Sequence, residues 1–488
     1  MTLNGLTRRA FLRQSGTLGV AGLVAPWAMN LAAMAEAAAA EAGSDYKALV
    51  CVFLQGGNDH ANTLIPVDAE GHAMYARMRG ALALPLSSLA ATTLAPRLGS
   101  AQNQQMALAP NLAALKPLFD AQRMAVLLNI GPLVQPTTLA QFQSAFLGTG
   151  DAVLPPKLFS HNDQQSVWQS YGGEGEITGW GGVIGDAFYE SLNASSALTC
   201  INLAGNAVYL AGNTVAQFMV NSKGPAPLKA LQASALFNST KCSEAFQALA
   251  TTQDPAAHRM SKEHSKIMSR AIGTNTNLLG ALVSVSPAPI FPADGSASAS
   301  PLAANPLAVQ LNTVARIIAA RDNANIKVKR QVFFVALAGF DHHDNLVTDH
   351  PAKLAQVAQA LSQFDQDLGP LRDQVTTFTA SDFGRTMASN GNGSDHGWGS
   401  YHFVMGGAVN GGRYFGELPD VGHDAQGHDT GAHNIGQGRL LPTLAVDQLA
   451  EALARWMEVT NAAQLDLVAP HRHQFSSSSN NLSGLFKA

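Results

Sequence analysis

Charged side chains, cysteines and long apolar runs are all scarce in this 488-residue chain, and each scarcity excludes a class of protein. Only 13% of the residues are charged, and no basic stripe offers a surface for nucleic acid. The three cysteines, Cys51, Cys200 and Cys242, are too few and too scattered for a disulfide framework or a zinc knuckle. A single Cys200–Cys242 bridge stays open, whereas Cys51 lies in an apolar run typical of a buried thiol. No apolar run is long and hydrophobic enough to predict a permanent membrane span.

The first 42 residues have the pattern of an export signal. Two adjacent arginines, Arg8 and Arg9, are followed by Phe-Leu and a third arginine, and then by a short apolar stretch rich in Ala and Gly. Ala33-Met34-Ala35 supplies small residues for a signal peptidase. We therefore expect the twin-arginine translocase to export the chain to the periplasm or beyond; the alternative is an ordinary amphipathic helix. Cleavage after Ala35 would change the formal charge from −4 to about −7.

The rest of the chain predicts an α/β fold. Four apolar runs end at Gly, Ser or another turn residue, as strands buried on both faces of a sheet do: 46–54, 125–130, 332–337 and 375–380. Helical spacing of apolar residues occurs between them, at 111–120, 306–321 and 353–368. This alternation predicts one domain over 43–475, a three-layer α/β/α sandwich with a mainly parallel sheet. An insertion or cap is expected at about 206–300, and a flexible Ser/Asn-rich tail over 476–488.

Four clusters of aspartate and histidine follow the predicted strands. They are Asn58-Asp59-His60, Asp341-His342-His343-Asp344, Asp382-Phe383-Gly384-Arg385 and Asp395-His396. In parallel sheets chemistry gathers at the carboxyl ends of strands, and carboxylate with imidazole is the ligand set of zinc, iron or manganese. The clusters together therefore predict a metal site. For a single residue, a helix cap or a loop hydrogen bond is the alternative. His423, His428 and His433 are expected to belong to a solvated loop.

The same motifs resemble a known family. The twin-arginine leader, the turn at Asp59, the segment from Leu158 to Gln165, the three later Asp/His clusters and the closing stretch 438–456 resemble the DUF1501 family. That family is similar to the alkaline phosphatase and sulfatase superfamily, and the resemblance covers essentially the whole mature chain. It implies an alkaline-phosphatase-like sandwich and metal-assisted attack on phosphate or sulfate esters.

The resemblance also implies a ligand set. The implied metal-binding residues are Asp59, Asp341, His342, His343, Asp382, Asp395 and His396. The implied cofactor is a divalent metal, with Zn, Mn, Ca and Mg all open. Two departures count against a complete two-metal site: Phe383 stands where a second ligand normally follows the aspartate, and the spacing from Asp341 to its histidine is short.

Ser160 is the candidate nucleophile, with His161 beside it as a further catalytic candidate. The alternative for Ser160 is a helix N-cap, and Thr137 and Thr138 are the other candidate nucleophiles. Arg385 could pair with an anionic substrate through its fork of donors, or form an ordinary salt bridge. No cysteine is followed by the Pro-x-Arg of a formylglycine sulfatase.

These observations predict an exported metal-dependent hydrolase of small phosphate or sulfate esters. The competing hypothesis is a non-catalytic exported protein of the same fold that acts in envelope binding or assembly, for which Phe383 is the main support. A redox protein with an organic cofactor is disfavoured because no Gly-x-Gly-x-x-Gly turn follows a strand.

Overall fold

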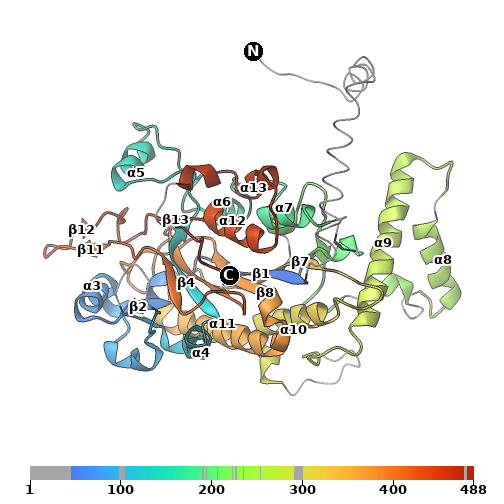
Figure 1. Ribbon diagram of the computed structural model, residues 1–488, viewed down its shortest axis with the longest axis horizontal. Coiled ribbons are helices and arrows are strands. Elements are labelled where there is room, and N and C mark those ends of the chain that lie inside the picture. The colour runs from blue at the N-terminus through green and yellow to red at the C-terminus, as the bar shows by residue number, and fades with distance from the viewer. Residues whose placement is uncertain are drawn as a thin grey trace, which may run out of the picture. The chain divides into compact units, whose positions relative to one another are not determined.

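Among the described residues, nine strands form the central sheet of the computed structural model (Figure 1). Their order is β10-β4-β9-β8-β1-β7-β5-β6, with β13 beside β4. The strands are β1 (Lys47–Gln55), β4 (Met124–Gly131), β5 (Cys200–Asn202), β6 (Phe218–Met219), β7 (Arg330–Ala338), β8 (Val375–Ser381), β9 (Ser400–Met405), β10 (Arg413–Gly416) and β13 (Leu444–Ala445). Two small antiparallel pairs are β2 (Leu64–Pro66) with β3 (Met106–Leu108), and β11 (Gly422–His423) with β12 (Asp429–Thr430).

The structure describes residues 45–97, 105–290, 300–476 and 481–487. Within the second range it leaves out 190, 191, 194, 206, 223, 226, 227, 233, 235 and 253. The predicted export signal at residues 1–42 lies outside these residues. Residues 46–488 form one compact unit.

The sheet is mainly parallel. The central strand β1 runs parallel to both of its neighbours, β7 and β8, whereas β9 runs antiparallel to β8 and β4. All four strands predicted from apolar runs are present, as β1, β4, β7 and β8. The predicted α/β class with a mainly parallel sheet is therefore confirmed.

Helices cover both faces of the sheet, which explains why its strands are apolar on both sides. Val50 and Val52 of β1 belong to the core beneath helices α10 and α11, while Cys51 and Phe53 belong to the core beneath α7 and α12. In Figure 1 these two helical layers lie above and below the sheet. The helices are α3 (Ala69–Arg79), α4 (Lys116–Asp120), α5 (Leu139–Phe146), α6 (His161–Ser170), α7 (Trp180–Asp186), α8 (Thr240–Thr251), α9 (Arg259–Ala281), α10 (Pro306–Ala319), α11 (Leu346–Leu368), α12 (Val446–Trp456) and α13 (Ala462–Val468).

Two predicted helices differ from the structure at their ends. The segment 111–120 begins as a 3-10 helix, Pro110–Leu115, before α4. Helix α11 begins seven residues before the predicted start at 353 and contains Pro351 as its sixth residue, where the helix lacks one backbone hydrogen bond. Asn305 caps α10 by accepting from the backbone N–H groups of Leu307 and Ala308.

The region 206–300, which was expected to be an insertion or cap, contains two of the helices. Within residues 206–300, α8 and α9 lie side by side to one side of the sheet (Figure 1). Residues 481–487, which belong to the expected flexible tail, pack against the rest of the chain. Leu485 is fully buried, and its carbonyl accepts from the backbone N–H of Asn410. Phe486 stacks on Trp456. Leu482 and Leu485 belong to the apolar core beneath α7 and α12.

Cys51, Cys200 and Cys242 are all free thiols, so the open Cys200–Cys242 bridge is not formed. Within the part of the chain that the structure describes, no helix combines the length and apolarity that a bilayer crossing requires.

Candidate metal centre

The sheet register brings three motifs to one edge. Leu54 of β1 pairs with Ser381 of β8, and Gln55 pairs with Ala338 of β7, so the three strands end together. The turn after β1 approaches closely: a Cβ on Gly56, whose φ is +116°, would lie 2.4 Å from the backbone nitrogen of Asp341. Only glycine fits there, because both the conformation and the space exclude a side chain.

Three imidazoles and one carboxylate converge at this edge. Ligand atoms of His161, Asp341 and His396 all lie within 4.8 Å of one another. His343 adds a third imidazole, with its Nε2 atom 2.8 Å from Nε2 of His396 and 3.1 Å from Oδ1 of Asp341. Asp341 is about half exposed, so the group opens to solvent. We call these four residues the His–Asp cluster.

Each imidazole of the cluster has an oxygen partner at Nδ1. His161 Nδ1 lies 2.7 Å from Asp382 Oδ2, His396 Nδ1 lies 2.7 Å from the carbonyl of Phe159, and His343 Nδ1 lies 3.3 Å from Asp395 Oδ1. Because the Asp382 and Phe159 oxygens only accept, at 2.7 Å, neutral His161 and His396 carry their protons at Nδ1 and direct their Nε2 lone pairs into the cluster. His343 has an accepting oxygen near each of its ring nitrogens, so its proton can be at either one.

The same atoms can hold a cation. The Nε2 atoms of His343 and His396 lie 2.8 Å apart, a hydrogen-bond distance at which one ring donates to the other, and a metal ion would displace that proton. The buried Nε2 atom of His161 has no hydrogen-bond partner and faces the carboxylate of Asp341 at 3.4 Å. Nitrogen lone pairs, a carboxylate and oriented Nδ1–H groups are what a bound transition metal requires. The residues present therefore fit a metal ion.

Asp382 contacts the His–Asp cluster through the Nδ1 atom of His161. It is fully buried, and its two oxygens accept from His161 Nδ1, from Gln165 Nε2 at 2.9 Å and from the backbone N–H of Gly56 at 3.1 Å. His161 and Gln165 lie one turn apart on α6, so both reach the same carboxylate. With these contacts Asp382 orients His161 rather than entering the cluster.

The charges of the cluster agree with this geometry. The hydrogen bond from His161 to Asp382 raises the pKa of His161, so a proton and a metal ion compete for its Nε2. Burial alone would raise the pKa of Asp341, but the hydrogen bond and charge of Arg385 outweigh it and lower that pKa. Burial lowers the pKa of His396. At neutral pH Asp341 is therefore an anion and His396 a neutral ligand.

Arg385 is committed to the protein itself. Its side chain pairs with Asp341 and donates to the carbonyls of Gly57 at 2.8 Å, Gly56 at 2.9 Å and Ser394. The guanidinium is fully buried and ties three segments of the edge together. Few donors remain for a substrate anion, so the structure places this residue in a positioning role.

Three other predicted ligands lie outside the cluster. Asp59 is fully buried and forms an ion pair with Arg79, which is fully buried too. His342 is buried against His350, with ring centroids 5.5 Å apart. Asp395 orients His343 and also accepts from Asn390.

The candidate nucleophiles are engaged in local contacts. Ser160 occupies the N-cap position of α6, where its hydroxyl donates to Asp163 Oδ2 at 2.8 Å. Thr138 caps α5 in a reciprocal pair with Gln141, and the Thr137 hydroxyl donates to the carbonyl of Gln135.

Phe383 forms part of the wall of the cluster. Its ring centroid lies 4.8 Å from that of His161 and 4.6 Å from that of His396. The residue that departs from the superfamily pattern thus packs on two imidazoles and limits their motion.

The sequence patterns missed the ligand geometry of His161 and the role of Gln165. The signal was present as i, i+4 spacing in His161-Asn-Asp-Gln-Gln165, which places both side chains on one helix face. The three loop histidines do not converge on one another. His423 pairs with Asp429 and His428 with Asp424, while His433 accepts from the backbone of Asp420.

A protein-family model described as "Protein of unknown function (DUF1501)" matches residues 46–468. The chain belongs to the DUF1501 family. The membership expected from the motifs is therefore confirmed. No curated relative matches this DUF1501 protein.

Several solved structures resemble this DUF1501 protein at low identity. The lipoteichoic acid synthase LtaP from Listeria monocytogenes is 9% identical, with 76% of this chain and 66% of that chain covered and a TM-score of 0.28. The C-terminal periplasmic domain of EcEptC from Escherichia coli, in complex with Zn, is 10% identical, with 75% and 74% covered and a TM-score of 0.27. A mutant of alkaline phosphatase PafA is 10% identical, with 70% and 64% covered and a TM-score of 0.27.

Proposed function

We propose that this DUF1501 protein is a metal-dependent hydrolase of phosphate or sulfate esters. The observation that carries the proposal is the convergence of three imidazole Nε2 atoms and the Asp341 carboxylate at the carboxyl edge of a parallel sheet. The cluster opens to solvent, as a site for a small substrate requires. Bound metal alone does not distinguish a hydrolase from a binding protein, so turnover is the measurement that decides between them.

The residues of the cluster have separate roles in this proposal. His161, His343 and His396 hold the metal through Nε2, and Asp341 supplies the one carboxylate ligand. Asp382 fixes the orientation of His161 by accepting from its Nδ1–H. Arg385 holds Asp341 in place and keeps it ionised. When bound, a metal at such a site lowers the pKa of a water molecule and stabilises charge on the ester oxygens.

The donor set narrows the choice of metal. Imidazole nitrogen suits zinc and other transition metals, whereas Ca²⁺ and Mg²⁺ prefer oxygen ligands. A single cluster with three nitrogen donors therefore favours Zn²⁺ over Ca²⁺ or Mg²⁺. The substrate is proposed to be a small anionic ester, attracted by the charge of the bound metal.

The test is metal analysis of the full chain combined with activity. Purified protein should contain about one equivalent of transition metal, and chelation should abolish turnover of p-nitrophenyl phosphate, bis(p-nitrophenyl) phosphate or p-nitrophenyl sulfate. Adding Zn²⁺ or Mn²⁺ should restore it. His396→Gln should lose metal and activity together. The matched control is His428→Gln, because His428 is exposed in a surface loop and pairs with Asp424 alone.

The outcomes separate the two candidate functions. Bound metal without turnover of any of the three esters would support the non-catalytic alternative, a binding or assembly protein of the envelope. Protein that stays metal-free after incubation with Zn²⁺ and Mn²⁺ would contradict the hydrolase proposal and the metal centre together.

We further propose that the twin-arginine translocase exports the protein, on the strength of Arg8-Arg9 and the apolar stretch behind them. Replacing both arginines by lysine should leave uncleaved precursor in the cytoplasm. Normal periplasmic accumulation of that variant would contradict export by this route.

A further inference from the structure

Helices α8 and α9, which lie side by side to one side of the sheet (Figure 1), belong to a segment with many exposed apolar side chains. Among the described residues, sixteen large apolar side chains are exposed, and nine of them fall between residues 219 and 283. On α9, Met260 is 75% exposed and Ile267 is 60% exposed. Soluble proteins rarely expose so many apolar side chains in one region, and such a surface marks a contact with a partner.

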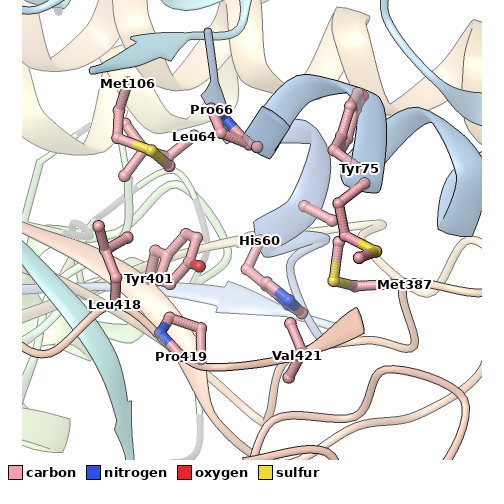
Figure 2. A pocket seen from close by; sticks show the side chains of 13 residues that line it. His60, Leu64, Pro66, Tyr75, Met106, Met387, Tyr401, Leu418, Pro419 and Val421 are labelled. Atoms are coloured by element: carbon pink, nitrogen blue, oxygen red, sulfur yellow. The ribbon is translucent and has the colours of Figure 1, made fainter. Parts of the chain in front are cut away.

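Apolar side chains in the body of the fold are enclosed by their neighbours. Figure 2 shows Leu64, Met106 and Leu418 around a cavity of about 100 Å³, and each of the three is at most 9% exposed. Met260 and Ile267 instead protrude from a helix surface, which is convex. A side chain on a convex surface is buried only by a partner that closes around it. The fluid headgroup layer of a lipid bilayer closes around such a side chain.

Only the N-terminal half of α9 presents this apolar line. Met260 and Ile267 lie seven residues apart and share one face of the helix. Thr274, seven residues further along the same face, is buried, and so is Leu278. The C-terminal half is therefore fixed against the protein, and it holds the N-terminal half, residues 259–271, in place for a contact.

Basic side chains lie beside the apolar line. Arg259 and Lys266 have the same spacing as Met260 and Ile267 one residue earlier, so they lie about 100° around the helix from them. Arg270 follows Lys266 by one turn on the same face. This is the pattern of a helix that lies in a membrane interface, where apolar side chains enter the headgroup layer and basic side chains reach the lipid phosphates.

The charge of α9 favours an anionic partner. The helix has four basic residues and one acidic residue, Glu263, in a chain whose net charge is −4. Lys266 pairs with Glu263, whereas Arg259 and Arg270 are exposed and have no ion-pair partner in the part of the chain that the structure describes. A second copy that packed α9 against α9 would bring like charges together, so charge disfavours such a dimer.

We propose that residues 259–271 of α9 bind the surface of an anionic phospholipid bilayer. Met260 and Ile267 enter the headgroup layer, and Arg259 and Arg270 contact the lipid phosphates. The helix lies on the bilayer and does not cross it. No residue of α9 belongs to the His–Asp cluster, so lipid binding can be measured in metal-free protein and its test is independent of the proposed hydrolase activity.

The experiment is flotation of residues 43–488 with lipid vesicles. This chain lacks the predicted export signal, whose apolar stretch could bind lipid by itself, and residues 46–488 form one compact unit. Vesicles of equimolar phosphatidylcholine and phosphatidylglycerol should float the protein. Phosphatidylcholine alone should bind it about 25-fold more weakly, because each of two unpaired arginines contributes about fivefold at an anionic surface. Absence of flotation with the mixed vesicles, or equal binding to both lipids, would overturn the proposal.

An apolar variant locates the contact. The double variant Met260→Gln with Ile267→Gln should fold, because both side chains are exposed, and should bind mixed vesicles about tenfold more weakly or less. The matched control is Leu147→Gln with Leu467→Gln, at positions that are 75% and 61% exposed and lie outside α9. This control should bind like the parent. Unchanged binding by the Met260 and Ile267 variant would contradict the proposal.

A charge variant tests the lipid headgroup. Arg259→Gln with Arg270→Gln should reduce binding to mixed vesicles about 25-fold. The control Arg77→Gln with Arg455→Gln removes the same charge at exposed positions on α3 and α12 and should bind like the parent. Equal losses in both would show that only net charge matters and would overturn the site. A dimer that forms without lipid and is abolished by the Met260 and Ile267 variant would assign the surface to a second copy instead.

Discussion

Asp59 and Asp341 follow neighbouring strands, β1 and β7, and each forms an ion pair with an arginine. The pair of Asp59 and Arg79 is closed: both side chains are fully buried, and no imidazole lies within the ion pair. The pair of Asp341 and Arg385 is open: the guanidinium is fully buried, but the carboxylate is 45% exposed and borders three histidines.

The difference indicates why Asp341, and not Asp59, is the proposed metal ligand. In the closed pair, the arginine supplies the positive charge that a cation would supply, and no solvent path remains. In the open pair, the arginine takes one side of the carboxylate and leaves the other toward His161 and His396. Asp341 can therefore serve as a ligand of the proposed metal centre beside Arg385, because its second face stays open toward the histidines.

Breaking the buried ion pair of Asp59 and Arg79 should have the largest effect on the free energy of unfolding. Arg79→Met leaves Asp59 as an uncompensated charge in the protein interior, and the expected loss is about 3–5 kcal/mol of the free energy of unfolding. Urea unfolding of chelated protein measures it. The double variant with Asp59→Asn should recover part of that loss, because no charge is then left unpaired. Equal stability of the two variants would show that the charge is not the cause.

Removing the Asp382 carboxylate should weaken metal binding more than it lowers the free energy of unfolding. Asp382→Asn removes the charged acceptor of His161 Nδ1–H, and we expect metal affinity to fall about 10–100-fold. Competition with a metal indicator dye measures this change. The control is Asp466→Asn, which alters an aspartate paired with His473 at the surface. A similar loss in both variants would contradict the supporting role of Asp382.

Acid should destabilise the folded protein through its fully buried histidines. Burial lowers the pKa of His402 to about 3, below its ordinary value of 6.5. Between pH 6.5 and about 3 the unfolded chain binds a proton there and the folded chain does not. The free energy of unfolding therefore falls as pH falls, by about 1.4 kcal/mol per pH unit for this residue. His60 and His350, with pKa values of about 4 and 3, add to the slope.

The variant His402→Gln removes the contribution of one histidine to that pH dependence. Urea unfolding at intervals from pH 6.5 to 4.5 should show a slope smaller than the parent's by about 1.4 kcal/mol per pH unit. Above pH 7.5 the difference between parent and variant should stay constant, because His402 is neutral in both states. Parallel curves below pH 6.5 would contradict the assignment.

The smallest effect is expected at the candidate nucleophile. Ser160→Ala removes one hydrogen bond to Asp163 and should reduce the free energy of unfolding by about 1 kcal/mol. Turnover of an aryl ester should change far less than in Asp382→Asn, because the Ser160 hydroxyl is engaged at the helix start. Loss of turnover with metal retained would instead identify Ser160 as the nucleophile.

The elements of the sheet were predictable because their signals are local. Strands β1, β4 and β7 are built on apolar runs, and β8 combines β-branched threonines with apolar residues; such segments form strands where helices cover both faces. The helix start at 346 was not predictable from apolar spacing, because Pro351 interrupts the pattern. The packing of Leu485 depends on a distant surface of the fold, which no local pattern encodes.

The sequence predicted which segments contribute to the candidate site, but not which of their side chains come together. Motif position placed Asp341, His343 and His396 at strand ends, and the structure brings them together. The same rule also placed Asp59 in the site. The sequence could not exclude it, because a sequence does not show which arginine will fold against a carboxylate. Arg79, on α3, is twenty residues away in the chain.

The position of β1 in the sheet determines when the protein can become complete during synthesis. This strand is the first to leave the ribosome, yet both of its neighbours, β7 and β8, come from residues 330–338 and 375–381. His396 is synthesised later still. The central strand therefore has no partner strand until residues 330–338 have been synthesised, and the four residues of the proposed metal centre can come together only after His396 has been added to the chain.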